Sequence, residues 1–196
     1  MGSNPTLSAI FPLLNNPSLR ILWRPEEAWD AVRIAAPAWH RSLLGLAAPL
    51  ALIPAVAWPI GHAVDPIGPG GTSARSLAAS FGATFVLCLV AVLVAAAAIY
   101  ALAPVFSAKR HWDRAMAVAV YSGVPVFLAS PLLASAVLTI LAIAALFHAC
   151  FLCSIGLRCL LGCRSEDAAM YVAAAGFVSG LAGMVLGGLS SLAGIL

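Results

Sequence analysis

The residues of this chain best suited to do chemistry are a histidine and two cysteines in the pattern His148-x-Cys150-x-x-Cys153. Imidazole and thiolate groups are good ligands for zinc and copper, so this spacing raises the possibility of a metal or redox site. On a helix, Cys150 and Cys153 lie near one face, whereas Cys159 and Cys163 lie near the opposite face, so one straight helix does not gather all four thiols. Reactive thiols also need an electropositive, accessible setting. We therefore favour ordinary packing here and expect no metal and no cofactor.

Other catalytic patterns are incomplete. The segment Gly176-Phe-Val-Ser179-Gly180 lacks the Gly-x-Ser-x-Gly spacing of a serine nucleophile. The chain has no His-Glu-x-x-His pair of the kind that binds zinc in metalloproteases. The long apolar segments contain no Asp, Glu, Lys or Arg, groups that ion-coupled transporters usually place inside the membrane. The sequence therefore predicts a protein that is not an enzyme.

The elements that hold these residues must be membrane helices. Hydrophobic residues make up 63% of the 196 positions and charged residues only 9%, against about 25% in a soluble domain. A spanning helix needs roughly 20 apolar residues, and the bilayer interior requires helices because the backbone must satisfy its own hydrogen bonds. The uncharged runs are 42–61, 76–108, 115–157 and 168–196.

The run 115–157 is too long for one span, since its 43 residues would extend about 65 Å as a helix. The best break is Ser130-Pro131, because proline lacks a helical donor and clashes with the preceding turn. We therefore predict an all-α, polytopic membrane bundle with a cytoplasmic N-terminal segment at 1–40 and a five-span domain at 41–196. The predicted spans are 42–61, 77–106, 115–130, 132–157 and 168–194.

The loop charges predict the orientation. With the N-terminus in the cytoplasm, nine of the ten Lys and Arg residues lie on the cytoplasmic side and only Arg75 lies outside. Cytoplasmic loops carry this excess in membrane proteins. Four spans would move Arg158 and Arg164 outside, so five spans, with the C-terminus on the opposite side, is the better solution.

The segment before the first span predicts an amphipathic helix at about 25–38. Proline suits the first helical position, and the two acidic residues that follow complement the helix dipole. The helix either lies on the membrane surface or docks a partner, or it packs on the cytoplasmic face of the bundle, and the sequence leaves these alternatives open. The residues that mark this interfacial helix are Pro25, Trp29, Val32 and Trp39.

Small residues form a stripe along the last predicted span. Gly176, Gly180, Gly183 and Gly187 recur at spacings of four, three and four, which places them on one side of a helix. Small residues allow close approach of helix backbones in membranes. The stripe predicts either tight packing inside the bundle, which we favour, or a homodimer face.

Three segments resemble the Yip (Ypt-interacting-protein) family of membrane proteins. They are the lead into the first span at 22–32, the Tyr121-Ser-Gly-Val-Pro125 element, and the short loop that begins at Gly156-Leu157 and continues through Gly162, Ser165 and Ala168-Ala169. The resemblance covers about 20–195 and implies the same five-span layout. An alanine-rich composition, compact loops and only about 40 residues before the first span indicate a bacterial relative, located in the inner membrane.

Two functional hypotheses follow. The first is a non-enzymatic scaffold, adaptor or accessory subunit, whose partners are the lipid bilayer and either other membrane protein subunits or further copies of itself, with no nucleic acid. The alternative is a channel or transporter for a small solute or lipid. The alternative depends on proline-kinked spans, which include Pro54 and Pro125, and on scattered hydroxyl groups. These hydroxyls belong to Thr84, Ser122, Ser130, Ser135 and Thr139.

Overall fold

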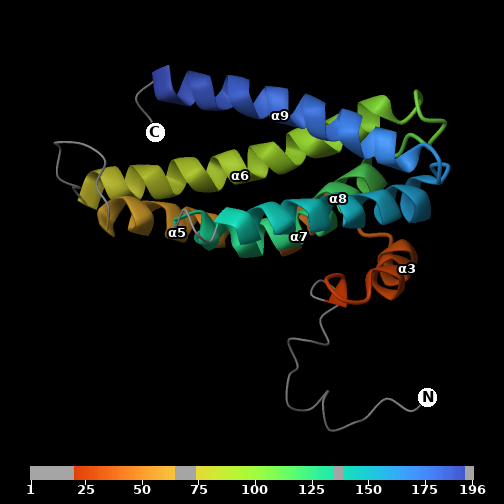
Figure 1. Cartoon of the computed structure of the whole chain (residues 1–196), viewed down its shortest axis with the longest axis horizontal. Coiled ribbons are helices and arrows are strands. Elements are labelled where there is room, and N and C mark those ends of the chain that lie inside the picture. Colours follow the sequence, from red (N-terminus) through yellow and green to blue (C-terminus); the bar gives the residue numbers. More distant parts are fainter. Residues whose placement is uncertain (1–19, 65–73, 135–138, 193–196) are drawn as a thin grey trace, which may run out of the picture.

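The structure, a computed structural model, describes residues 20–64, 74–134 and 139–192, and the described part is all-helical (Figure 1). Side-chain surroundings are described for these segments except at 61–64, 74–76, 133–134, 139 and 186–192. The elements in chain order are α3 (Pro25–Ala35), α4 (Trp39–Ser42), the π-helical turn η2 (Leu43–Ala47), α5 (Ala48–Val64), α6 (Ala74–Leu102), α7 (Trp112–Ala129), the 3₁₀ turn η3 (Ser130–Ala134), α8 (Thr139–Leu161) and α9 (Ala168–Leu192).

Among the residues that the structure describes, five helical segments are long and apolar enough to cross a membrane, which confirms the predicted helical bundle with five spans. In the first of them α4, η2 and α5 form one continuous helix, and its prolines stay within it because neighbouring helices can satisfy the freed carbonyls. The five segments are Trp39–Ile60, Leu77–Leu102, Trp112–Leu132, Ile140–Leu161 and Ala168–Val185.

Several boundaries differ from the predicted ones for local reasons. α3 ends at Ala35 instead of 38, because Ala36 takes a left-handed conformation (φ 40°) and Pro37 follows. α6 ends at Leu102 instead of 106, with a proline two residues later. The chain leaves α7 through the 3₁₀ turn η3, where Ser130-Pro131 predicted a break, and α8 begins at Thr139 instead of 132.

α7 lies at the centre of the bundle. It packs against α8, α6 and the first spanning helix, and more than half of its span is buried, against less than a third of each other span. α9 lies at the periphery, against α6 and the end of α8, and it diverges from α6 toward its C-terminal end (Figure 1). The spans therefore differ sharply in how much of their surface the chain itself covers.

Most polar contacts gather at one end of the bundle, which we call the basic end. It comprises α3, the connection 103–111 and the connection 162–167, together with the helix ends that they join. Nine of the ten basic residues of the chain lie here, with six acidic residues. The connections are tied to the last turn of α8, where the Lys109 N–H donates to the Leu161 carbonyl (2.8 Å) and Arg114 Nη1 donates to the Leu160 carbonyl (2.9 Å). These donors satisfy carbonyls that a helix end leaves without partners.

Candidate functional site

α3 docks on the bundle through Trp29, whose side chain is completely buried. Beneath the indole lies Gly156 of α8, where an added Cβ would stand 2.7 Å from Trp29 Cζ2 and 2.8 Å from Cη2. A residue with any side chain does not fit there unless one helix moves, so the glycine forms the recess that receives the ring. Ala28 and Val32 are buried beside it. The side of α3 that carries these three residues is thus covered by the bundle, whereas Ile34 stays exposed.

The other neighbours of Trp29 are aromatic and apolar. The Tyr121 ring of α7 lies 6.1 Å from the indole, centroid to centroid, at a tilt of 57°. Trp29 Nε1 is buried, and no hydrogen-bond partner for it is found in the described part of the chain. Gly156 was missed as a site residue by sequence reasoning, which met it only as part of a family-like loop, because a single glycine has no spacing to signal its role.

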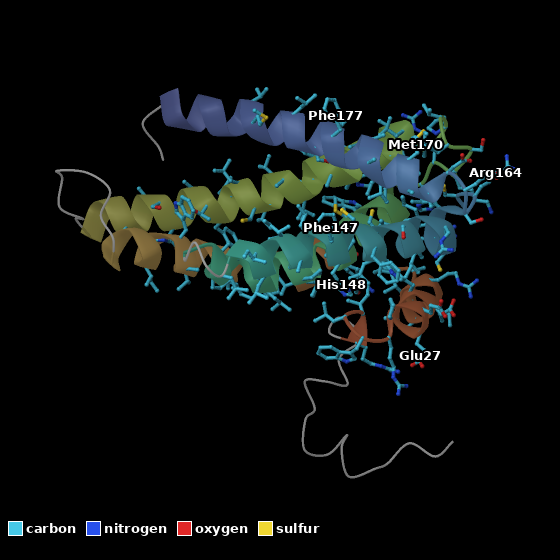
Figure 2. The ribbon with its side chains drawn as sticks, viewed as in Figure 1. Glu27, Phe147, His148, Arg164, Met170 and Phe177 are labelled. Atoms are coloured by element: carbon cyan, nitrogen blue, oxygen red, sulfur yellow. The ribbon has the colours of Figure 1, made fainter. Side chains whose placement is uncertain are left out.

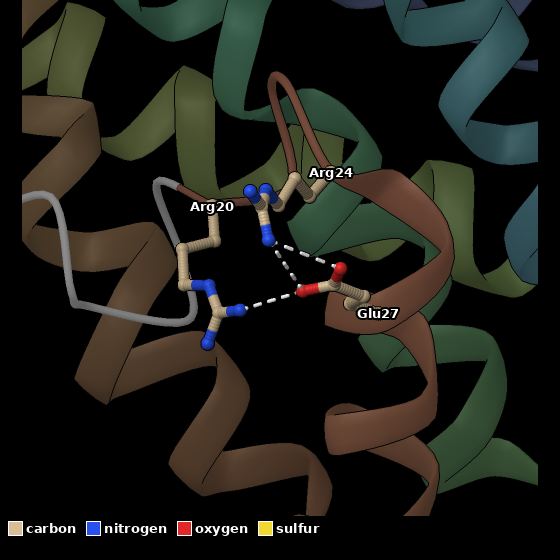
Figure 3. Close-up of polar contacts among 3 residues, drawn as sticks. All are labelled: Arg20, Arg24 and Glu27. Carbon is tan, nitrogen blue, oxygen red and sulfur yellow. Dashed lines mark hydrogen bonds and ion pairs between the residues drawn. The ribbon is translucent and has the colours of Figure 1, made fainter. Parts of the chain in front are cut away.

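The chain enters α3 through a turn held by one carboxylate (Figure 3). Glu27 accepts a hydrogen bond from Arg20 Nη2 at 2.7 Å and from Arg24 Nη1 at 3.2 Å. The Arg24 N–H also donates to the Arg20 carbonyl at 2.8 Å, directly before Pro25 starts the helix. All three side chains are exposed, so each ion pair contributes at most about 1 kcal/mol to stability. The anchor of α3 is therefore Trp29, and the charged turn sets the direction of entry.

Trp39 begins the first spanning helix and is tied to the start of α7. Its backbone N–H donates to Asp113 Oδ1 at 2.8 Å. Its ring is 41% exposed and stands edge-on to the His40 ring. Of the residues predicted to mark an interfacial helix, Trp29 and Val32 are buried in the bundle and Trp39 keeps an exposed ring suited to the headgroup level.

The first turns of α9 are anchored by Tyr171, which is fully buried. Its hydroxyl donates to the Ile99 carbonyl of α6. Its ring stacks on Phe106 at 4.6 Å between centroids, with an interplanar angle of 9°. Ala168 and Ala175, one turn to either side, are also buried. These contacts set where α9 leaves the bundle.

Beyond these turns, three described glycines of α9 have open space where a side chain would stand. Gly176, Gly180 and Gly183 are exposed, and nothing lies within 4 Å of a Cβ added at any of them. Tight packing inside the bundle, the interpretation we favoured, does not hold for these three, because no described part of another helix reaches them. The surroundings of Gly187 lie outside the described residues. Contact with a second polypeptide stays a prediction.

Large apolar side chains lie around these glycines. Met170 and Phe177, both labelled on α9 in Figure 2, are 69% and 68% exposed, and Met184 is 76% exposed. We use the name α9 glycine face for the surface formed by Gly176, Gly180 and Gly183. In a bilayer either lipid or another apolar helix covers such a surface, because water does not reach it.

The histidine and cysteines of α8 have separate surroundings. The His148 ring, labelled in Figure 2, lies 6.2 Å from the Phe151 ring. Cys150 is exposed on the helix surface, and Cys153 has the Ser122 hydroxyl of α7 as a polar neighbour. Within residues 20–64, 74–134 and 139–192, no three His, Cys, Asp or Glu side chains come together as metal ligands would.

Cys163, in the connection between α8 and α9, is buried at 6% exposure. Burial raises the pKa of its thiol above the ordinary value of 9.0, and the nearby Asp167 carboxylate raises that pKa further. Because the thiolate is the reactive form, this thiol is a weak nucleophile at neutral pH. It fits a structural role at the junction.

Comparison with known proteins finds a matching family model. No curated protein and no solved structure is similar enough to match the chain. The model of the Yip1 domain matches residues 19–187, from the turn before α3 through most of α9. That range includes the Trp29–Gly156 contact, the central helix α7 and the α9 glycine face. The chain therefore belongs to the Yip1 domain family of membrane proteins.

Proposed function

We propose that this protein is a non-enzymatic accessory or adaptor subunit that binds a transmembrane helix of another membrane protein through the α9 glycine face. The observation that carries the proposal is the exposure of Gly176, Gly180 and Gly183 on a peripheral helix, with open space at each Cβ position. Lipid gives two helices no hydrophobic reason to associate, so close van der Waals contact must supply the attraction. A row of glycines lets the backbones of two helices approach most closely, because no side chain separates them.

The anchoring of α9 supports this role. Tyr171 binds the start of the helix to α6 through its hydroxyl and its stacked ring, so the glycine face has a set direction relative to the bundle. A binding surface that is already oriented loses less entropy when a partner docks. The exposed Phe177 and Met184 are large, polarisable groups that can pack around a partner helix.

The hydroxyl groups in the spans favour an adaptor over a solute pathway. Ser122 donates to the Val118 carbonyl at 2.6 Å and Ser179 to the Ala175 carbonyl at 2.7 Å, each within its own helix. Ser130 donates to the Phe127 carbonyl at 2.7 Å and lines a hollow whose other lining residues are all apolar. A polar pathway needs such groups to face a shared cavity. Of the two prolines near which the alternative predicts a pathway, Pro125 is buried in the central helix beside Ser122, and Pro54 is half-buried in α5.

We place the basic end in the cytoplasm and the protein in a bacterial inner membrane. The support is the gathering of nine of ten basic residues at one end of the bundle. A cysteine introduced at Arg164 tests the orientation, since a membrane-impermeant maleimide should label it in inverted vesicles and not in intact cells.

The test of the adaptor role is a matched pair of glycine replacements. Gly180→Leu adds a bulky side chain to the α9 glycine face, while Gly82→Leu makes the same change on α6, where an added Cβ also meets nothing. Each variant, carrying an affinity tag, is isolated from native membranes in mild detergent beside the wild-type protein, and co-purified proteins are quantified by mass spectrometry.

We expect one or more membrane proteins to be recovered at constant stoichiometry with the wild-type protein and with Gly82→Leu, and to fall at least tenfold with Gly180→Leu. A differently tagged second copy of the chain reveals whether the partner is the protein itself. Equal recovery with both variants, or a monomeric preparation free of partners, contradicts the proposal.

A further inference from the structure

A cavity of about 270 Å³ lies at the basic end, away from the α9 glycine face. Its walls come from α3 and the residues after it, from the start of α7 and from the end of α8. Val32, Ala117 and Leu160 line it with apolar groups and are themselves almost completely buried. Ligand pockets measure roughly 300–1,000 Å³, so this one has room for a small group and not for a large cofactor.

The polar lining is mainly cationic. Arg33 enters from α3 and Arg114 from α7. Arg114 donates to the Leu160 carbonyl, a neutral group, and within the described residues no carboxylate lies at ion-pair distance from it. Arg33 Nη2 bonds to Asp30 at 2.9 Å. A guanidinium carries five N–H donors, so both residues keep donors for another group.

One acidic residue, Asp113, also lines the cavity. Its Oδ1 accepts the Trp39 N–H at 2.8 Å, and its Oδ2 lies 4.0 Å from His111 Nδ1. Oδ1 is therefore satisfied by the protein itself, whereas Oδ2 lies beyond hydrogen-bond distance from His111 Nδ1. His111 precedes α7 and makes no capping hydrogen bond with its side chain, so the helix start adds positive potential, which Asp113 in the first turn partly offsets. The cavity as a whole favours an anion.

We propose that this cavity binds the phosphate of a phospholipid headgroup, with Arg33 and Arg114 as its ligands. Two guanidinium groups entering from different helices suit the several oxygens of a phosphate. The apolar wall suits the glycerol and the first acyl carbons. Trp39 and Trp112, whose rings favour the headgroup level, stand at the same helix starts that border the cavity. Free phosphate shares this chemistry, and the test separates the two sources.

The experiment uses the purified full-length protein in a non-ionic detergent. Short-chain phosphatidylglycerol, inorganic phosphate and a short-chain glycolipid without phosphate are titrated separately, and binding is followed by the shift in thermal unfolding and by native mass spectrometry. Arg33→Gln and Arg114→Gln remove one cationic ligand each. Arg164→Gln is the matched control, because it removes the same charge from an exposed ion pair with Glu166 outside the cavity.

We expect the wild-type protein and Arg164→Gln to bind the phospholipid equally, and Arg33→Gln and Arg114→Gln to bind it about tenfold more weakly, a loss in the range of one charged hydrogen bond. Arg33 is more than half exposed, so its replacement leaves the fold intact, and Arg114→Lys keeps the charge if Arg114→Gln proves unstable. If inorganic phosphate competes with the phospholipid for binding, the ligand is free phosphate. If it does not compete, the ligand is the lipid. Binding of the glycolipid as tight as that of the phospholipid, or equal binding by Arg33→Gln and Arg164→Gln, overturns the proposal.

Discussion

Two surfaces of this bundle are formed by helical glycines, and they differ in whether another part of the chain covers them. At Gly156 on α8 the space above the backbone is filled by Trp29 of α3, with indole carbons 2.7 and 2.8 Å from the position a Cβ would occupy. At Gly176, Gly180 and Gly183 on α9 the same space is open. The first surface is closed by the chain itself, whereas the second is left for lipid or for another protein.

The difference shows that the role of a glycine in a membrane helix depends on which group lies opposite it. A recess filled by one large aromatic ring stabilises the fold, because the ring and the backbone beneath it gain many close van der Waals contacts. A row of open glycines leaves stability nearly unchanged and offers a place where a second helix can approach. The same residue type thus supports folding at one site and association at the other.

The strongest test of the occupied surface is Trp29→Ala. Removing a fully buried indole leaves a cavity and should lower the free energy of unfolding by about 3–5 kcal/mol. Thermal or denaturant unfolding in detergent measures the change, and limited proteolysis near residue 35 detects release of α3. A loss below about 1 kcal/mol would show that α3 is held by its charged turn, and the contrast between the two surfaces would fail.

Gly156→Ala tests the same contact from the other side. The new methyl group would overlap the indole, and overpacking of this kind costs about 1–3 kcal/mol. Gly180→Ala is the control, because alanine has room there and favours helix by roughly 0.5–1 kcal/mol over glycine. Unfolding free energies of the two variants should therefore change in opposite directions. A change of the same sign and size at both positions would remove the basis of the comparison.

Tyr171→Phe tests the anchor that holds α9 beside α6. The ring stack on Phe106 is retained and only the hydrogen bond to the Ile99 carbonyl is lost, so stability should fall by about 0.5–1.5 kcal/mol. The informative readout is partner recovery, which should decline less than in Gly180→Leu. Full loss of the partner with Tyr171→Phe would mean that orientation of α9 matters more than the glycine face.

The smallest effect is expected at Cys163, which lies at the junction of α8 and α9. Because burial and Asp167 raise its pKa above 9.0, alkylation should be slow at pH 7.5 and should rise about tenfold per pH unit up to at least pH 9. Peptide mass spectrometry after timed iodoacetamide treatment follows this thiol separately from the other four. A plateau below pH 8 would indicate an exposed, activated thiol, and faster labelling in Gly156→Ala would show that loss of the α3 contact loosens the junction.

Much of the architecture could be predicted from residue types alone. The five spans followed from apolar runs longer than the bilayer core, and the break near Ser130-Pro131 followed from the chemistry of proline. Trp29 and Val32 were predicted to mark an amphipathic helix, but the surface that covers them was not predicted. Gly156 stayed hidden because its role depends on a ring 127 positions earlier in the chain.

The sequence by itself determined that lipid surrounds most of this protein, how many spans it has, and that its charged residues gather at one end. These properties depend on composition, segment length and loop charge, which need no knowledge of neighbours. Only the tertiary structure decided which small residues are covered, because in a bilayer the inner and outer faces of a helix are equally apolar. No polar face marks the outside of a membrane helix. The residue types along α9 would therefore be the same whether its glycines contact a helix or lipid. Contact geometry alone separates Gly156 from Gly180.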